Sequence, residues 1–259
     1  MKQDDDDLLA TLRNSAMAKK VLAAFAATRL HQLRSSLIEP CRLQCPVEVR
    51  ARSVLRVFCG SLVLSSVVFA QSSARQWNNP PTNFKESPTS LALEVPAGTD
   101  YWRVTHYGFV RDNGPFRYEV RSGNFEAKAQ IHGEYHELYH QAGLMIRKDD
   151  KNWIKTGIEY VNGHQNVSAV VTRDFSDWSV LPRSDSPASI WMRLQRYNDT
   201  VQISYSLDGQ KWSMVRLAYF PPQLPVQIGM VAAAPGKQPF EVIFDHFSIA
   251  PLSSPPGED

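Results

Sequence analysis

The sequence predicts an all-β fold of the sandwich or barrel type at residues 76–250, preceded by a leader at residues 1–75. Three observations predict it. Apolar residues from Leu91 onward recur with period two, which places alternate side chains on opposite faces of a strand. About twelve such runs follow one another at intervals of roughly 8–14 residues, separated by turn-forming residues. No convincing amphipathic helix of ten or more residues occurs after residue 76. About 175 residues in one unit suffice for a large two-sheet sandwich with a buried core.

Composition separates the leader from the body. All 6 Trp and all 9 Tyr lie after residue 75, whereas all 3 Cys lie before it. A body without cysteine excludes a disulfide scaffold, a cysteine-ligated metal and a thiol nucleophile there. The formal net charge of +2 is too small a bias to indicate a nucleic-acid partner.

The leader contains a segment with the pattern of a secretory signal peptide. A basic flank at residues 50–56 precedes the largely apolar run Val57–Phe69, and Ala70 ends a small-residue cleavage site before Gln71. The run is shorter than the roughly 20 apolar residues that span a membrane. Its distance from residue 1 leaves three interpretations open: export from a later start, an uncleaved anchor, or a chance apolar stretch. Cleavage after Ala70 would make the protein secreted or exported; otherwise it is expected to be cytoplasmic.

Ten of these strand candidates follow in chain order. They are residues 91–95, 124–135, 141–149, 152–161, 167–174, 189–197, 200–206, 211–220, 225–234 and 240–249. The dipeptide Asp208–Gly209 between two alternating runs predicts a type I′ turn, because both residues tolerate positive φ angles. The Pro-rich tail at residues 251–259 is predicted to be disordered.

A dense group of aromatic and hydrogen-bonding residues occurs in TDYWRVTHYGFVRDNGPFRY, at residues 99–118. Aromatic rings stack on the apolar face of a sugar ring, while Arg, His and Asp bind its hydroxyl groups. The candidate ligand-binding residues of this segment are Trp102, Arg103, His106, Tyr107, Arg111 and Asp112. In the alternative interpretation, Arg103 and Asp112 form salt bridges that tie a long loop to the sandwich, and the aromatic side chains belong to the core.

Two neighbouring strand candidates carry polar side chains on one predicted sheet face. Period two places these residues opposite the apolar side chains of the core. They are Gln141, Arg147, Lys155 and Glu159. The face is either a ligand-binding surface beneath the 99–118 segment, or a solvated surface with cross-strand ion pairs worth about 0.2–1 kcal/mol each. We expect Arg147 and Glu159 to pair with Lys155 or with each other.

Two other patterns favour structural roles. Asp174 and Asp177 resemble the paired carboxylates of a glycosidase, but their spacing in a turn-forming stretch predicts a capped, buried turn. Three histidines, at 132, 136 and 140, would suggest a metal site on a helix. Gly133 and the flanking strand pattern predict a loop instead, so no metal site and no cofactor are expected.

The body lacks the motifs of common enzyme classes. It contains no G-x-S-x-G nucleophile elbow, no phosphate-binding loop, no H-E-x-x-H and no dinucleotide fingerprint. It also lacks the E-x-D-x-E strand motif of jelly-roll glycosidases. The absence of these motifs favours a protein that is not an enzyme.

The body resembles a known family in several blocks. They are WNNPP, GTDYWRVTHYGFVRDNGPF, LYHQAGLMIRKDDKNWIKTGIEYVNG, SAVVTRDFSDWSV, IWMRLQR, YSLDGQKW and RLAYFP. The body is similar in these blocks to the regulation-of-enolase family, a concanavalin A-like domain of unknown function. The resemblance implies a jelly-roll sandwich of two antiparallel sheets and no established catalytic residues. The sequence departs from the family pattern at two positions. His140 stands where the family usually has Asp, and Pro115 stands where it usually has His.

Three functions remain open at this point. The preferred one is a non-catalytic binding module, with carbohydrate as the expected ligand. The alternatives are an intracellular regulatory protein that acts on carbohydrate metabolism through a protein partner, and a glycoside-active enzyme with Glu159 or Asp112 as the acid/base. We expect a monomer with no nucleic-acid partner and no membrane span in the folded body.

Overall fold

The computed structural model describes residues 74–222 and 225–257. The signal-like segment, the cysteines and most of the predicted leader lie outside the described residues. Within the described ranges, no helix is long and apolar enough to cross a membrane.

The described residues form an all-β structure, as predicted. Its strands are β1 (Gln76–Asn78), β2 (Phe84–Glu86), β3 (Ser90–Val95), β4 (Tyr101–Arg103), β5 (Val110–Asp112), β6 (Phe116–Arg121), β7 (Phe125–Gly133), β8 (Gln141–Arg147), β9 (Asn152–Val161), β10 (His164–Arg173), β11 (Phe175–Arg183), β12 (Ile190–Tyr197), β13 (Thr200–Ser206), β14 (Ser213–Tyr219), β15 (Val226–Ala233) and β16 (Phe240–Pro251).

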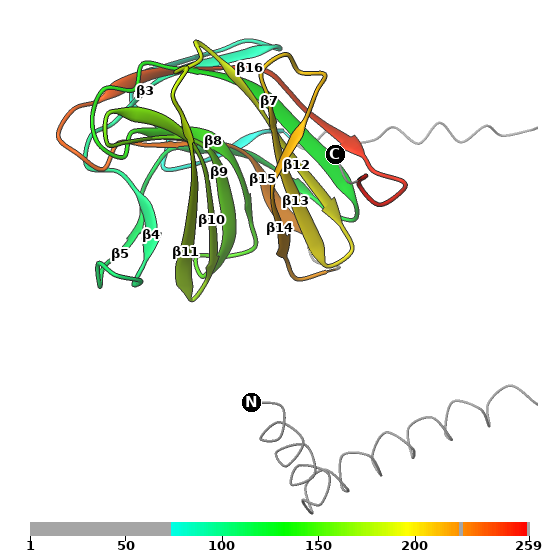
Figure 1. Cartoon of the computed structure of the whole chain (residues 1–259). Coiled ribbons are helices and arrows are strands. Elements are labelled where there is room, and N and C mark those ends of the chain that lie inside the picture. Colours follow the sequence, from blue (N-terminus) through cyan, green and yellow to red (C-terminus); the bar gives the residue numbers. More distant parts are fainter. Residues whose placement is uncertain (1–73, 223–224, 258–259) are drawn as a thin grey trace, which may run out of the picture. The chain divides into compact units, whose positions relative to one another are not determined.

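Two seven-stranded antiparallel sheets pack face to face. The first sheet has the order β1-β6-β15-β8-β9-β10-β11, and the second has the order β14-β13-β12-β7-β16-β3-β2. Strands β4 and β5 pair only with each other and form a separate hairpin. Figure 1 shows this hairpin beside β8–β11, on the side of the first sheet that faces away from the second. The predicted β-sandwich of two antiparallel sheets is therefore confirmed.

The main core lies between the two sheets. Period-two alternation supplies it: Leu144 and Ile146 of β8 and Ile154 and Ile158 of β9 all face the second sheet. The opposite faces of these strands are also buried, because β8 is buried along its whole length. The central strands β8 and β9 of the first sheet are thus covered on both sides.

A second, smaller hydrophobic core covers the outer face of the first sheet. It joins the outer face of the first sheet to the β4–β5 hairpin, and it includes Tyr101, Trp102, Met145, Trp153 and Val170. The rings of Tyr101 and Trp153 meet edge to face with centroids 6.1 Å apart. The interpretation of this sheet face as a solvated surface is therefore wrong.

Several local expectations were wrong. The connection between β13 and β14 runs from residue 207 to 212, and Asp208 is not among the described residues with positive φ, whereas Gly209 is, at 72°. The turn is therefore not type I′. Its structure depends on the carboxylate of Asp208, which accepts the backbone N–H groups of Lys211 and Gln210, each at 2.8 Å.

The segment around Asp174 also differs from its prediction. Phe175–Arg183 is the edge strand β11 of the first sheet, and the side chains of Asp174 and Asp177 are 63% and 71% exposed. The turn is therefore not buried. Asp174 lies within 3.9 Å of Lys151, and Asp177 within 3.0 Å of Arg216.

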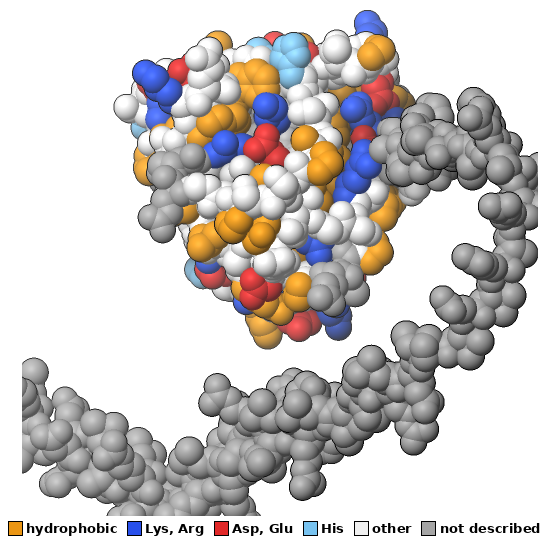
Figure 2. Space-filling model, turned by 90° about the vertical axis from the view of Figure 1, so that its right-hand side faces the viewer, with side chains coloured by type: hydrophobic (Ala, Val, Ile, Leu, Met, Phe, Trp, Pro, Cys, Tyr) orange, Lys and Arg blue, Asp and Glu red, His pale blue; other side chains and the backbone are white. Residues whose placement is uncertain are grey.

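The side of the molecule with β12, β13 and β16 carries mixed charges. Figure 2 shows Lys and Arg side chains interspersed there with Asp and Glu, and hydrophobic side chains in small separate groups. Near this side the carbonyl of Gly257 accepts a hydrogen bond from Gln202 at 3.1 Å, so the described part of the tail contacts the sandwich.

Candidate functional site

A cavity of about 320 Å³ lies between the outer face of the first sheet, the β4–β5 hairpin and the loop before β8. Its size is at the small end of the range for small-molecule sites, roughly 300–1,000 Å³. The residues that line it are Gly98, Asp100, Trp102, Tyr107, Phe109, Arg111, Tyr139, Gln141, Lys155, Glu159, Trp178 and Pro235.

Aromatic side chains line much of this cavity. The rings of Trp102 and Tyr107 meet edge to face at 5.6 Å, and Tyr107 stacks on Phe109 at 5.6 Å. Tyr139 and Trp178, from the loop before β8 and from β11, meet edge to face at 6.3 Å. These five rings present flat apolar surfaces, the surfaces against which a sugar ring packs.

A hydroxyl pair joins two segments of the lining. The hydroxyl groups of Tyr107 and Tyr139 lie 2.9 Å apart and share a hydrogen bond. This bond, together with partial burial, raises the pKa of Tyr139 to about 12. Tyr139 has a positive φ of 68°, as do His106 at 64° and Val104 at 62° in the hairpin tip. Such φ values are costly for residues with a Cβ atom, most of all for β-branched valine.

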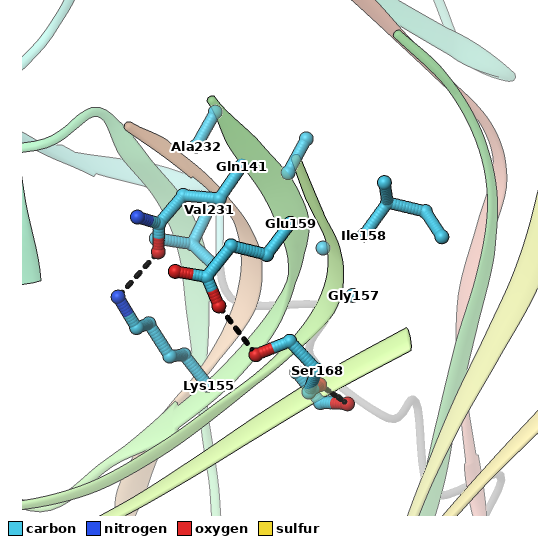
Figure 3. Close-up of a pocket in the computed structure, with 11 residues that line it drawn as sticks. Gln141, Lys155, Gly157, Ile158, Glu159, Ser168, Val231 and Ala232 are labelled. Atoms are coloured by element: carbon cyan, nitrogen blue, oxygen red, sulfur yellow. Dashed lines mark hydrogen bonds between the residues drawn. The ribbon is translucent and has the colours of Figure 1, made fainter. Parts of the chain in front are cut away.

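The floor of the cavity is polar and comes from β8 and β9. The ammonium group of Lys155 donates hydrogen bonds to the carbonyl of Tyr101, at 2.8 Å, and to Gln141 Oε1. It also lies 3.7 Å from Asp100 Oδ1. Figure 3 shows the side chains of Gln141, Lys155 and Glu159 pointing toward one another, while Ile158 points to the opposite side of the sheet.

Glu159 is the buried carboxylate of this floor. The residue is only 7% exposed. Its Oε2 atom accepts hydrogen bonds from Ser168 Oγ at 2.7 Å and from Trp178 Nε1 at 2.8 Å. Burial raises its pKa above the ordinary value, and the nearby Lys155 ammonium only partly opposes this effect. The site thus holds a carboxyl group that binds its proton more tightly than a carboxyl group in water.

Two paired glycines leave space in the floor. Gly143 of β8 and Gly157 of β9 are directly opposite each other, and they line a small pocket of about 20 Å³ with Gln141, Lys155 and Glu159. This volume is enough for about one water molecule.

Six of the ten predicted site residues line the cavity. They are Trp102, Tyr107, Arg111, Gln141, Lys155 and Glu159. The hairpin and the polar sheet face, 30 or more residues apart in sequence, therefore lie together as predicted. Their role in ligand binding stays a prediction.

The other four predicted residues lie outside the lining. Arg147 forms a bidentate ion pair with Asp112, at 2.6 and 2.7 Å. The prediction that Arg147 pairs with Lys155 or Glu159 is wrong, because the hairpin brings a better-placed carboxylate. Arg103 lies 3.5 Å from Asp150 and donates to the carbonyl of Asp174. Both arginines thus tie the hairpin to the sheet, as the alternative interpretation expected.

His106 lies in the tip of the hairpin. It is exposed, and its ring contacts Tyr107 edge to face at 4.7 Å. It does not point into the cavity as a lining residue.

Four important lining residues were missed from the sequence. Asp100 and Phe109 belong to the dense 99–118 segment, whose residue types were the available signal. Trp178 follows the stretch of Asp174 and Asp177 that was interpreted as a turn, and the Asp and Ser residues around it obscure the alternation of β11. Nothing in the sequence indicated that Tyr139 lines the cavity, apart from its position two residues before Gln141.

The three histidines do not gather around one point. His132 lies 3.4 Å from Asp245, whereas His140 stacks on Phe240 at 4.5 Å and contacts Glu137. Among the described residues no group of three or more His, Cys, Asp or Glu side chains is arranged to hold a metal ion.

The fold and the residues of the cavity can now be compared with known proteins. A family model described as "Protein of unknown function (DUF1349)" matches residues 77–252. The chain belongs to this family. Regulation of enolase protein 1 of Saccharomyces cerevisiae is 37% identical over 177 residues, which are 68% of this chain and 89% of that protein. The predicted family resemblance is confirmed.

Two further similarities agree with this placement. Uncharacterized protein AN7484 of Emericella nidulans is 27% identical over 135 residues, 50% of this chain and 67% of that protein. The crystal structure of a functionally unknown protein from Saccharomyces cerevisiae has a TM-score of 0.67 and 34% identity, and the match covers 70% of this chain and 97% of that chain.

A more distant likeness concerns the fold alone. The GH43 protein BlXynB from Bacillus licheniformis has a TM-score of 0.54 at 15% identity, and the match covers 69% of this chain and 37% of that chain. The DUF1349 sandwich therefore shares its architecture with part of a glycoside hydrolase. Shared architecture at this identity carries no information on activity.

Proposed function

We propose that this DUF1349 protein is a non-catalytic binding module whose cavity takes a carbohydrate ligand. One observation supports this proposal above all: aromatic rings line a cavity of about 320 Å³ whose floor is built from Gln141, Lys155 and Glu159. Sugars need both surfaces, because their ring faces are apolar and their edges carry hydroxyl groups.

The charges around the cavity support a neutral ligand. Two acidic residues, Asp100 and Glu159, and two basic residues, Lys155 and Arg111, line it. The formal charges of these four groups cancel. A neutral polar ligand therefore meets no uncompensated charge of either sign.

The cavity favours binding over hydrolysis, with one alternative. Asp112 is held by Arg147 and lies outside the lining, so it is unsuited to act as an acid/base. Glu159 supports the alternative of a glycoside-active enzyme, because a carboxyl group with a raised pKa is suited to general acid catalysis. We rank this alternative second, because the body lacks the paired-carboxylate strand motif of jelly-roll glycosidases.

The name of the yeast relative supports a further alternative. Regulation of enolase protein 1 carries a regulatory role in its name, and the same role here would require a protein partner. A surface that binds protein does not depend on the buried floor of the cavity, so substitutions there distinguish the two functions.

The test is a glycan-array screen of the full chain, followed by titration of each hit with two matched variants. Tyr107→Ala removes an aromatic wall that is 43% exposed, and Phe175→Ala removes a ring that is 61% exposed on β11 and outside the cavity. We expect Tyr107→Ala to weaken binding by more than twofold and up to roughly tenfold, since an aromatic contact contributes about 0.5–1.5 kcal/mol. Phe175→Ala should change binding less than about twofold.

Three results would oppose the proposal. They are the absence of any retained glycan, equal losses in the two variants, and release of a free sugar from a bound glycoside. The last result would favour the enzyme, and it should then vanish in Glu159→Gln.

A further inference from the structure

The hydrogen-bond donors at the inner end of the cavity are already used. Both N–H groups of the Gln141 amide have acceptors, Asp100 Oδ1 at 3.4 Å and the carbonyl of Tyr139 at 3.1 Å. Lys155 donates to the carbonyl of Tyr101 and to Gln141, and its charge lies beside Asp100. The indole N–H of Trp178 is directed to Glu159.

The wall has no further indole donor to offer. The N–H group of Trp102 donates to the carbonyl of Thr105 at 2.8 Å. Every donor group of the inner cavity therefore has at least one acceptor within the protein.

The acceptors at the inner end are not all used. Among the described residues, no hydrogen bond reaches Glu159 Oε1, although Oε2 accepts two. Likewise Asp100 Oδ1 accepts from the backbone N–H of Tyr101 and from Gln141, while no described group donates to Oδ2. At a pH above the raised pKa of Glu159 both carboxyl groups are ionised, and an ionised carboxylate offers about four acceptor positions. Two carboxylate oxygens in the lining thus have free capacity.

The donors that remain lie toward the mouth. Of the two hydroxyl hydrogens of the Tyr107–Tyr139 pair, one is used between the two hydroxyl groups, and no group in the described part of the chain accepts the other. Arg111 is exposed, with its guanidinium 5.5 Å from the centre of the Phe109 ring. The cavity therefore accepts hydrogen bonds at its inner end and donates them at its mouth.

We propose that the inner end recognises its ligand as a hydrogen-bond donor: two hydroxyl groups of one neutral sugar ring donate to Asp100 Oδ2 and Glu159 Oε1. This inference rests on the proposed carbohydrate-binding function. A neutral ring fits better than a protonated amino sugar, because the Lys155 ammonium already lies 3.7 Å from Asp100 Oδ1 and repels a second cation.

Replacement of single hydroxyl groups by fluorine tests this inference, because fluorine keeps the size and polarity of the group but cannot donate a hydrogen bond. The full-length protein is titrated by NMR with D-glucose, D-galactose, D-mannose and D-xylose. Every sugar that binds is then compared with its monofluorinated analogues, one hydroxyl position at a time. We expect two positions at which fluorine weakens binding at least tenfold, since an unpaired buried acceptor is costly.

The variant Glu159→Gln sharpens the test. The amide oxygen can accept the bonds from Ser168 and Trp178, which places the amide NH₂ where Oε1 faces the cavity. A donor then replaces an acceptor at one point. The parent sugar should bind at least tenfold more weakly, and the fluorine sensitivity should disappear at one of the two positions. The matched control is Glu134→Gln, which removes an exposed carboxylate outside the cavity and should change neither value.

The outcomes separate this inference from the proposed function. If a parent sugar binds and every fluorinated analogue binds within about twofold of it, the inference is overturned while the carbohydrate-binding function stands. The same conclusion follows if D-glucosamine binds at least tenfold more tightly than D-glucose. If no sugar binds, the proposed function fails and this inference fails with it.

Discussion

Glu159 is held in a position that is unfavourable for a charged side chain. A buried carboxylate requires several donors to replace its hydration, and among the described residues only Ser168 and Trp178 donate hydrogen bonds to this one. A side chain that serves only the stability of a sheet face would be apolar at such a position, like Trp153 or Met145 on the same face. The retained carboxyl group is consistent with a role in ligand contact.

The stability of the protein should therefore depend on pH through Glu159. The pKa of this group is raised in the folded state, so the native protein binds more protons than the unfolded chain between the ordinary pKa of 4.5 and the raised value. The contribution of Glu159 to the free energy of unfolding therefore decreases as the pH rises through this window. Above the window the contribution no longer changes with pH. Glu159→Gln removes this loss, so the variant should be more stable than wild type at neutral pH.

Urea unfolding at several pH values checks this prediction. The difference between Glu159→Gln and wild type should grow from about pH 4.5 upward. The control Glu134→Gln should show no such growth. A variant that is less stable than wild type at neutral pH would contradict the prediction. The hydrogen bonds of the carboxylate would then stabilise the protein by more free energy than its desolvation costs.

The pairing of β8 with β9 depends on two glycines. A Cβ atom added to Gly143 would lie 1.8 Å from the carbonyl oxygen of Thr156, and one added to Gly157 would lie 2.0 Å from that of Ala142. Both contacts are with backbone atoms of the paired strand, so neither can be relieved by rotation of a side chain.

Gly143→Ala should therefore destabilise the protein by about 1–3 kcal/mol or more. It should also weaken ligand binding, because Gly143 lies beneath the polar floor. Gly257→Ala is the matched control, since no atom lies within 4 Å of a Cβ atom there. Equal melting temperatures for the two variants would contradict the prediction.

The β4–β5 hairpin depends on the ion pair between Asp112 and Arg147. Arg147→Ala leaves a carboxylate without its partner, and should reduce the free energy of unfolding by roughly 2 kcal/mol. The value is lower than for a fully buried pair, because the Asp112 side chain is 30% exposed.

A double-mutant cycle with Asp112→Asn measures the pair directly. The double variant should lose less stability than the sum of the two single variants. Additive losses would indicate that the ion pair contributes nothing beyond the individual side chains.

The main strands could be predicted from sequence because their alternation is long. Strands such as β8, β9 and β10 each bury one continuous apolar face, so period two is evident over seven or more residues. Strands of three residues, such as β1, β2, β4 and β5, are too short to show any period.

The site could be predicted only in part, for a related reason. Alternation places Lys155 and Glu159 on a common face, but it does not reveal what covers that face. The cover comes from a hairpin whose partner for Arg147 is 35 residues away in sequence, at Asp112. Trp178 and Tyr139 reach the cavity through the tertiary packing of an edge strand and a loop, for which the sequence has no local pattern.

At the scale of the whole molecule, the sandwich contains a complete core within the described residues. The core residues fall between Leu91 and Phe244, with partly buried residues such as Trp77 and Ile249 packed against them. We therefore expect residues 74–259, expressed alone, to fold with a β-type circular dichroism spectrum and a single cooperative thermal transition.

A side-by-side melt of the 74–259 fragment and the full chain checks this expectation. The two melting temperatures should agree within a few degrees. A fragment that is molten or insoluble, beside a full chain that melts cooperatively, would show that the preceding residues are required for folding.

The separate pairing of β4 with β5 has a kinetic consequence. The hairpin adds no hydrogen-bonded strand to either large sheet, and side chains such as Asp112 and Tyr107 fasten it at its edges. It can therefore open at a free energy below that of global unfolding, while the sandwich stays intact. A ligand enclosed beneath it would leave only as often as the hairpin opens. The residence time of the ligand would therefore depend on Arg147, which holds the hairpin through Asp112 although it lies outside the cavity lining. Amide exchange in β4 and β5 would slow when ligand is bound, while exchange in the strands of the main core would stay unchanged.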